Sequence, residues 1–223
     1  MPRKKAAEEQ SWSCPNCAPP EEEDGLEEEF DFMMLPQMLP PAKPEMRTVG
    51  LYGDIGVEKG METVYSLFAL KDSGKEIDLE TEEVSYKPIE MIICTGGGAA
   101  TDMFAIYDTM RIVRQDCEIS TLGIGEVMSA GVLVLASGTK GKRKIGANCR
   151  LMLHSVSAGH HGSLFTLENE FDEFKWMQER YFAAIAAESK LKSRQIKKIL
   201  DQKVNVYFDA EQAVKYGLAD EII

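Results

Sequence analysis

An alternation of short apolar runs with longer amphipathic segments fills all but the N-terminal part of this sequence, and it constrains the fold more than any other feature. The runs at 48–52, 89–94 and 118–124 have the length and composition of buried strands. Apolar residues recur at helical spacing over 60–70 and 99–114, after the first two runs. Repeated strand and helix segments are typical of βαβ units. The sequence therefore predicts an α/β fold.

The second half of the chain continues this alternation. A helix of small apolar residues is predicted over 129–137, the end of a strand at 151–154 and a long helix over 167–188. Between the last two, the segment 155–163 is rich in Gly and His and predicts a loop. The polar segment 71–88, near the start of the domain, predicts an excursion over the surface.

Residues 1–45 have a different composition. They hold eleven Asp or Glu against four Lys or Arg, several prolines and no amphipathic period. Such a segment buries too little apolar surface to offset the entropy of ordering the chain. We therefore expect a disordered acidic, Pro-rich leader over 1–45 and one folded domain over 46–223. The apolar stretch 30–39 is the exception within the leader and is suited to docking on the domain or on a partner.

The charge pattern disfavours several classes of function. The formal net charge is −12 and no basic face is evident, which argues against nucleic-acid binding. No run approaches the roughly 18 apolar residues of a membrane helix. The first ten residues are largely polar and no apolar stretch follows them, so a secretory signal is not expected. We expect a cytoplasmic protein that binds neither nucleic acid nor membrane.

Cysteine usage fits a reducing compartment. The chain has five cysteines, an odd number, scattered through its length. Cys14 and Cys17 have the spacing of half a zinc site, but no second pair of Cys or His lies nearby in the sequence. We therefore expect no metal and no cofactor.

Ser129 is the first residue with a candidate chemical role. The segment 125–131 (GEVMSAG) places it between a predicted strand and a predicted helix, with Ala and Gly after it. Free backbone N–H groups at a helix N-terminus favour developing negative charge, and small neighbours let a substrate carbonyl approach. A serine at this position is also a frequent N-cap of a buried helix. The segment alone is compatible with both roles.

His154 is the second candidate. It is one of three histidines and follows the apolar run 151–153, where a ring can be held rigidly at the edge of a sheet. From there it could accept the proton of a serine and later protonate a leaving amine. A half-buried structural histidine is the alternative.

Three glycines, Gly96, Gly97 and Gly98, end one predicted strand and precede the next helix. Glycines permit unusual backbone angles and close approach, so a backbone N–H there can point at a tetrahedral oxyanion. A phosphate cradle is the second interpretation, although no lysine follows at the spacing of a P-loop. A plain structural turn is the third.

The order and context of these segments carry more weight than any one of them. From residue 95 to the C-terminus the chain resembles the Clp protease proteolytic subunit (ClpP) family of serine peptidases. The matching segments are 95–98 (TGGG), 105–110 (AIYDTM), 125–131, 138–143 (GTKGKR), 152–154 (MLH) and 210–223. The segment 48–54 (TVGLYGD) extends the resemblance to the start of the domain.

This resemblance implies a fold, an activity and an assembly. The fold is the ClpP/crotonase-like spiral of ββα units, with the helix over 167–188 as a protruding handle. The activity is that of an endopeptidase that hydrolyses unfolded polypeptides inside a ring-shaped chamber. The partners are further copies of the chain, in stacked heptameric rings that form a tetradecamer, and a AAA+ Clp-type ATPase that unfolds the substrates and uses the ATP.

The resemblance also implies catalytic roles. Ser129 matches the family's nucleophile and His154 its general base, which later acts as an acid. The separation between these two residues fits the family. The backbone N–H groups of Gly98 and Ala130 match the donors that stabilise the oxyanion.

The third catalytic residue of the family is an aspartate, and Asn205 stands at its place. The amide oxygen of an asparagine can accept a hydrogen bond from the ring of His154, but it cannot neutralise the imidazolium as a carboxylate does. Asp201 and Asp209 are the substitutes if the register of this loop differs. The sequence leaves these three possibilities open.

Other departures from the family leave two alternative functions. Gly96 replaces a proline, the segment 71–88 is longer than the family's loop, and no clear counterpart of the N-terminal helix precedes Arg47. A catalytically weak or inactive structural subunit of the ring is one alternative, favoured by Asn205. A phage-type head-maturation peptidase of the same fold, acting without an ATPase, is the other, favoured by the missing helix.

Overall fold

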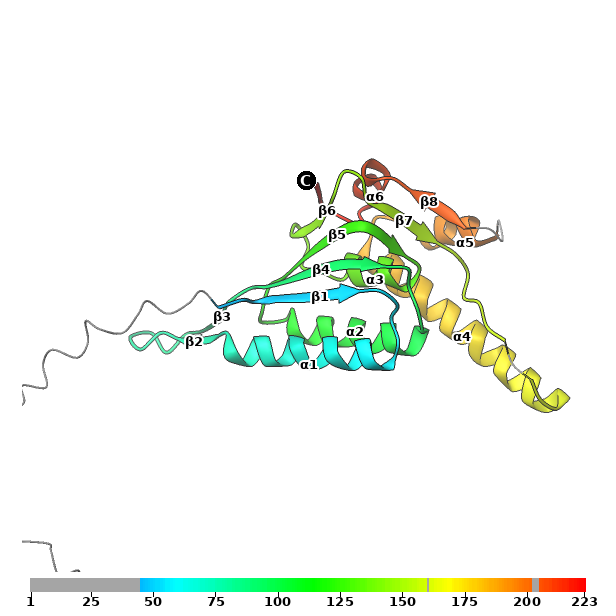
Figure 1. The fold of residues 1–223 in the computed structure, drawn as a ribbon, viewed down its shortest axis with the longest axis horizontal. Helices are drawn as coiled ribbons and strands as arrows, with labels where there is room; N and C mark the ends of the chain where they lie inside the picture. Colours follow the sequence, from blue (N-terminus) through cyan, green and yellow to red (C-terminus); the bar gives the residue numbers. More distant parts are fainter. Residues whose placement is uncertain (1–44, 160, 202–204) are drawn as a thin grey trace, which may run out of the picture. The chain divides into compact units, whose positions relative to one another are not determined.

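The structure is a computed structural model that describes residues 45–159, 161–201 and 205–223. The predicted leader, with Cys14 and Cys17, lies outside the described residues. The described residues form an α/β domain in which helices alternate with the strands of one mainly parallel sheet (Figure 1). The α/β fold predicted from the sequence is therefore confirmed.

The strands of this domain are β1 (Thr48–Tyr52), β2 (Lys75–Ile77), β3 (Val84–Tyr86), β4 (Ile89–Thr95), β5 (Ile119–Met128), β6 (Arg143–Ile145), β7 (Arg150–Leu153), β8 (Val206–Phe208) and β9 (Glu221–Ile222). The helices are α1 (Val57–Ser73), α2 (Ala100–Val113), α3 (Ala130–Ala136), α4 (Leu164–Glu188), α5 (Ser193–Asp201) and α6 (Ala210–Tyr216). The short strands β2 and β3 form a separate antiparallel hairpin within the predicted surface excursion.

The long strand β5 is the centre of the sheet. It pairs in parallel with β4, which in turn pairs in parallel with β1. On the other side, the first half of β5 pairs with β6 and its second half with β7, again in parallel. Beyond β7 lies β8, which is antiparallel to it, and beyond β6 lies β9. The sheet therefore divides into two arms at β5, and the second half of β5 runs beside β7.

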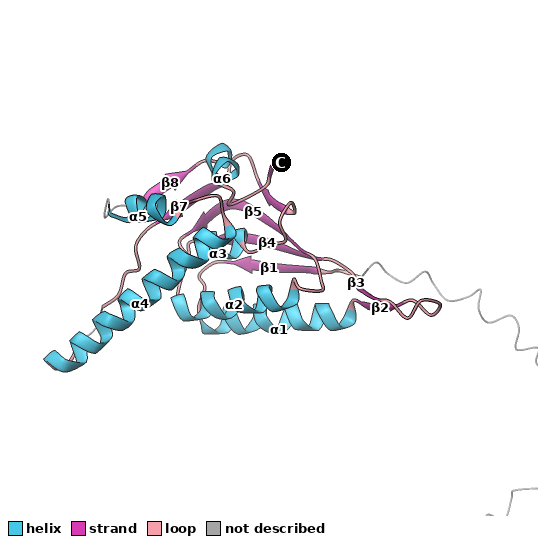
Figure 2. Cartoon of the chain, turned by 180° about the vertical axis from the view of Figure 1, so that it is seen from behind, coloured by secondary structure: helices cyan, strands magenta, loops and turns pink. Residues whose placement is uncertain are grey.

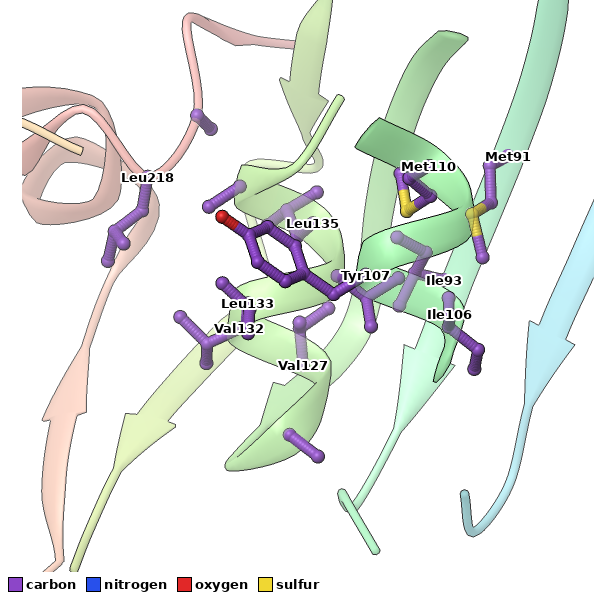
Figure 3. Packing of buried hydrophobic residues seen from close by; sticks show 14 of the residues in the cluster. Met91, Ile93, Ile106, Tyr107, Met110, Val127, Val132, Leu133, Leu135 and Leu218 are labelled. Atoms are coloured by element: carbon purple, nitrogen blue, oxygen red, sulfur yellow. The ribbon is translucent and has the colours of Figure 1, made fainter. Parts of the chain in front are cut away.

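The helix α3 forms the centre of the core. All of its residues are buried, and it packs against β5 and α2. Figure 3 shows Leu133 and Leu135 of α3 close to Tyr107 of α2, with Val127 of β5 nearby. Protein cores pack at the density of organic crystals, so small displacements are resisted. The junction between β5 and α3 is consequently one of the most constrained places in the domain.

The helix α1 is longer than the predicted segment 60–70. Its buried residues are Gly60, Thr63 and Leu67, whereas the apolar side chain of Met61 is exposed. A Cβ atom at Gly60 would lie 3.1 Å from the Cβ atom of Asp102 on α2. The small residue thus lets α1 and α2 lie close together, side by side (Figure 1). The apolar spacing predicted the helix, and of its apolar residues Leu67 is buried whereas Met61 is not.

The helix α4 has two halves with different surroundings. Its buried residues, Tyr181, Ala184, Ile185 and Glu188, all lie in the C-terminal half. The N-terminal half projects away from the domain, as the predicted handle does (Figures 1 and 2). It begins at Leu164, earlier than predicted, because Ser163 caps it by accepting a hydrogen bond from the Thr166 N–H. No helix of the described ranges combines the length and apolar character needed to cross a membrane.

Candidate active site

Three neighbouring parallel strands end at the same edge of the sheet. After β4 comes the glycine turn 96–98, after β5 comes Ser129, and after β7 comes His154. Since β8 is antiparallel to β7, Asn205 enters β8 from this same edge. Ligands of open α/β sheets bind outside the carboxyl ends of the strands. Four separate segments of the chain thus bring the candidate site residues to one edge of the sheet.

Ser129 and His154 contact each other. The Oγ atom of Ser129 lies 2.8 Å from the Nε2 atom of His154, which is hydrogen-bond distance. Both residues line a cavity of about 140 Å³, together with Gly98, Ala130 and Tyr181. A hydroxyl beside an imidazole nitrogen, facing a cavity, is the arrangement of an activated nucleophile and its base.

The backbone of Ser129 is strained. Its φ of 51° and ψ of −118° lie outside the regions that residues with a Cβ atom normally adopt, at a cost of about 1–3 kcal/mol. Three hydrogen bonds hold it there. Its N–H donates to the carbonyl oxygen of Met152 at 2.7 Å, and its own carbonyl oxygen accepts from the Val132 N–H at 3.0 Å and the Tyr181 hydroxyl at 2.8 Å. A sharp turn of this kind between strand and helix presents the serine hydroxyl to substrate in enzymes of the α/β-hydrolase fold.

The side chain of Ser129 does not cap α3. Ser129 occupies the N-cap position, yet its hydroxyl accepts no hydrogen bond from the amides of the helix. The hydroxyl points to His154 instead. The geometry therefore favours the chemical role over the capping role that the sequence left open.

The glycine turn lies directly against Ser129. Gly97 and Gly98 have φ values of 105° and 152°, which favour glycine. A Cβ atom on Gly97 would lie 2.7 Å from that of Ser129, and one on Gly98 would lie 2.0 Å from the carbonyl oxygen of Ile55. The Thr95 hydroxyl accepts from the Gly97 N–H at 3.0 Å. Both glycines are needed for the backbone to approach this closely.

Two residues that line the cavity, Gly98 and Ala130, have backbone N–H groups without an acceptor in the described part of the chain. Neither the Gly98 nor the Ala130 N–H donates a hydrogen bond to any residue of the described ranges. Ala130 is the first residue of α3, and the first amides of a helix have no acceptor within it. Two free donors beside a nucleophile can stabilise a tetrahedral oxyanion.

Asn205 stands apart from this arrangement. The ladder between β7 and β8 ends with Leu153 opposite Val206, so the next pair in this register is His154 and Asn205. Asn205 is exposed, and no hydrogen bond joins it to His154 in the described part of the chain. The register thus places Asn205 opposite His154, without a hydrogen bond between them in the described ranges.

The two substitutes for Asn205 are placed differently. Asp209 follows β8, about 13 Å further along the strand direction, where its carboxylate caps α6 by accepting from the Gln212 N–H at 2.8 Å. Asp209 is therefore engaged as a helix cap away from His154. Asp201 is the last residue of α5, and its side chain lies outside the described part of the structure.

Tyr181 is a part of the site that the sequence reasoning missed. It is only 5% exposed and contributes to the wall of the cavity from α4. Burial raises the pKa of Tyr181, so its hydroxyl remains protonated and acts as a donor to the Ser129 carbonyl. The spacing of Tyr181, Ala184, Ile185 and Glu188 along α4 marks one face of the helix and was the signal available in the sequence.

The C-terminal end of α4 is held by a buried ion cluster. Glu188 is 3% exposed, and its carboxylate accepts hydrogen bonds from Arg114 at 2.5 and 3.0 Å and from the Tyr107 hydroxyl at 3.2 Å. Lys140 lies 3.1 Å away as a second cation. Burial raises the pKa of Glu188, but the hydrogen bonds and charges of Arg114 and Lys140 outweigh it and hold the pKa below its ordinary value.

Arg143 connects this cluster to the end of the chain. Its Nη1 donates to the backbone carbonyl of Glu188 at 2.7 Å, and its guanidinium binds the Asp220 carboxylate at 2.5 and 2.8 Å. The hydrogen bonds from Arg143, together with that of the Gly141 N–H, lower the pKa of Asp220 to about 2. In the described ranges, no three or more His, Cys, Asp or Glu side chains gather as metal ligands would.

Comparison with known proteins agrees with this geometry. The sequence pattern of the Clp protease family matches residues 45–223. A relative, the ATP-dependent Clp protease proteolytic subunit 2 of Frankia casuarinae, is 36% identical over 145 residues, which are 65% of this chain. The matched region spans 64% of the length of that relative. The family match covers the strand edge with Ser129 and His154 and the whole described domain, and the chain belongs to the Clp protease family.

Proposed function

We propose that this chain is a ClpP-like serine endopeptidase in which Ser129 is the nucleophile and His154 the general base. The observation that carries the proposal is the 2.8 Å contact between Ser129 Oγ and His154 Nε2 on the wall of a cavity. Membership of the Clp protease family supports it independently.

The proposed reaction has two halves. As Ser129 Oγ attacks the scissile carbonyl, Nε2 of His154 takes its proton, and the N–H groups of Gly98 and Ala130 donate to the oxyanion that forms. The imidazolium then protonates the leaving amine, which departs and leaves an acyl group on Ser129. Water, deprotonated by His154, attacks this ester through a second tetrahedral state, and Ser129 is released with its proton restored.

Asn205 is proposed to orient the ring of His154. Its amide oxygen would accept a hydrogen bond from Nδ1, which the register of β7 and β8 favours because the two residues form the next pair of the ladder. An amide fixes the direction of the ring but carries no charge, so the imidazolium is stabilised less than by a carboxylate. The chain is then a slow peptidase.

The proposed substrate is an unfolded polypeptide. A cavity of about 140 Å³ admits one side chain of an extended segment and excludes a folded domain. Substrates would be supplied by a AAA+ Clp-type ATPase in the cytoplasm, and the three cysteines of the described ranges, which are all free thiols, are consistent with a reducing compartment.

The proposed assembly is a pair of stacked heptameric rings that encloses the active sites in a chamber. The projecting half of α4 supports self-association, because Leu164, Phe165 and Phe171 are 67%, 76% and 59% exposed. Apolar side chains gathered on a projecting helix are stabilised when another copy covers them.

A second candidate function is a ring subunit that cleaves poorly. The observation that favours it is the absence of a hydrogen bond between Asn205 and His154 in the described ranges. Without such a bond the imidazole ring can rotate away from Ser129, and the resting contact would then be one of several states.

Hydrolysis by the purified full chain tests the proposal. The native mass is measured first, and then cleavage of a fluorogenic peptide and of unfolded casein, with and without a Clp unfoldase and ATP. We expect a ring-sized particle that cleaves the peptide alone and casein faster with the unfoldase, and no cleavage by Ser129→Ala. A ring without cleavage supports the structural subunit, and a monomer without cleavage contradicts both functions.

A further inference from the structure

We propose that Tyr181 is a positioning residue of this active site, which orients the Ser129–Ala130 peptide so that the Ala130 N–H faces the oxyanion. This inference rests on the proposed function, because it assigns Tyr181 a part in peptide hydrolysis. It starts from the hydrogen bond of 2.8 Å between the Tyr181 hydroxyl and the Ser129 carbonyl oxygen.

The geometry of the peptide unit makes this bond consequential. The carbonyl of Ser129 and the N–H of Ala130 belong to the same planar unit, and no cis peptide bond occurs in the described ranges. In a trans peptide the C=O and N–H point in opposite directions. Because Tyr181 holds the carbonyl on one side, the Ala130 N–H is directed to the other, and a rotation of this plane would move the donor away from the oxyanion.

The plane needs this support because Ser129 is strained. With a φ of 51°, the residue gains free energy by rotating its backbone toward an ordinary conformation. Without the tyrosine hydroxyl, the Ser129 carbonyl keeps one hydrogen bond to the described residues, that of the Val132 N–H at 3.0 Å within its own turn. A hydrogen bond to the carbonyl also polarises the amide, which strengthens its N–H as a donor.

Tyr181 is itself held in place. Its ring is buried. About two helical turns further along the same face of α4, Glu188 anchors the helix through its bonds to Arg114. Burial also keeps the hydroxyl protonated. The donor therefore has a fixed position and a fixed protonation state, as a positioning group requires.

The test compares Tyr181→Phe with Tyr107→Phe in the full chain. Tyr107 is a matched control: it is 6% exposed, and its hydroxyl bonds to Glu188 instead of Ser129. For each protein we measure kcat and KM on a fluorogenic peptide, the pH profile of kcat, the melting temperature and the affinity for a peptide boronate. The boronate forms a tetrahedral adduct that uses the oxyanion donors, whereas KM reports mainly on the bound substrate.

We expect Tyr181→Phe to lower kcat about tenfold and to weaken boronate binding by a similar factor, which corresponds to the loss of one hydrogen bond. KM and the pH profile should not change, because the ring remains and no titrating group is lost. Tyr107→Phe should lower the melting temperature comparably and leave kcat and boronate affinity at the wild-type level.

Two outcomes overturn the inference. Tyr181→Phe with wild-type kcat and boronate affinity shows that the hydroxyl is dispensable, and equal losses in both variants show that it acts only through stability. If Tyr181→Phe fails to fold, Tyr181→Met, with an adaptable apolar side chain, replaces it in the same measurements. Failure of the proposed function looks different, since the wild type itself would then neither cleave the peptide nor bind the boronate.

Discussion

The two ends of the candidate site are held in different ways. Ser129 lies between β5 and the fully buried α3, and its backbone is fixed by one hydrogen bond donated to β7 and by two accepted from α3 and α4. Asn205 is exposed at the start of the three-residue edge strand β8. The core therefore determines the geometry of the proposed nucleophile, whereas the proposed third residue depends on a short peripheral ladder. Changes near Ser129 should affect both rate and stability, and changes at Asn205 should affect rate alone.

The largest effect is expected at His154, the proposed general base, which contacts Ser129. His154→Ala should lower peptide hydrolysis roughly 10⁴-fold or more, because the serine proton then has no acceptor. The matched control is His161→Ala, which removes an exposed imidazole of the following loop and should leave the rate unchanged. Rates are measured on a fluorogenic peptide with folding checked by circular dichroism. Substantial hydrolysis by His154→Ala would remove His154 from the mechanism.

The second prediction tests how strongly α4, which holds Ser129 through Tyr181, is anchored to the core. Glu188→Ala removes a buried carboxylate and leaves the largely buried guanidinium of Arg114 and the half-exposed Lys140 without this partner, which should lower the free energy of unfolding by about 3 kcal/mol. The melting temperature should fall by roughly 10 °C in a thermal scan. Glu168→Ala, an exposed glutamate on the same helix, is the control and should change stability by less than about 0.5 kcal/mol. Equal melting temperatures for the two variants would mean that α4 is anchored elsewhere.

At the peripheral end we expect rate changes without stability changes. Asn205→Asp should speed peptide hydrolysis roughly tenfold, because a carboxylate stabilises the imidazolium more than an amide does. Asn205→Ala should slow it by freeing the ring to rotate. The free energy of unfolding of both variants should lie within about 0.5 kcal/mol of that of the wild type, since Asn205 is exposed.

Two aspartate variants decide whether Asn205 is the third residue. Asp209→Asn should perturb a helix cap and leave the rate nearly unchanged. Silent changes at Asn205 together with an inactive Asp201→Asn enzyme would transfer the role to Asp201, and an inactive Asp209→Asn enzyme would transfer it to Asp209.

The smallest expected effect is the loss of stability at low pH that comes from Asp220. The pKa of Asp220 is lowered to about 2 from 3.8 by its bonds to Arg143, so its stabilising contribution is present above about pH 4 and is lost as the pH falls toward 2. Allowing for solvent screening of a partly exposed pair, the loss is about 1 kcal/mol. The lowered pKa of Glu188 acts in the same direction. In Asp220→Asn, the free energy of unfolding should depend less on pH between about pH 4 and pH 2. An unchanged pH dependence would contradict the role of the Asp220–Arg143 pair.

Much of the fold could be predicted from the sequence because long strands and helices extend over enough residues to show a hydrophobic pattern. The strands β1 and β4 were predicted from their apolar runs, and the buried face of α2 from apolar residues at helical spacing. The strands β6 and β8 have three residues each, too few for a pattern, and the positive φ of Gly125 interrupts β5 where the sequence predicted its end. In α1 the spacing alone does not distinguish the buried Leu67 from the exposed Met61, because the buried face includes Gly60, whose small size lets α2 approach closely.

The candidate site was predictable in part for a similar reason. Ser129 and His154 were identified from their segments and the family resemblance, and the structure brings them into contact. The pairing of β7 with the second half of β5, which causes that contact, is a long-range property that no local pattern encodes. Tyr181 was missed because its partner is a backbone carbonyl 52 positions away in the chain. Every residue has such a carbonyl, so the sequence does not show which one a tyrosine binds. The roles of these residues in catalysis stay predictions.

The most direct test of the central claim is covalent labelling of the nucleophile. The full chain is treated with a fluorophosphonate probe, and the modified residue is mapped by mass spectrometry in the wild type, in Ser129→Ala and in Ser120→Ala as a control on the same strand. We expect a single modification at Ser129, retained in Ser120→Ala and absent from Ser129→Ala. Labelling at another residue, or equal labelling of Ser129→Ala, would contradict it.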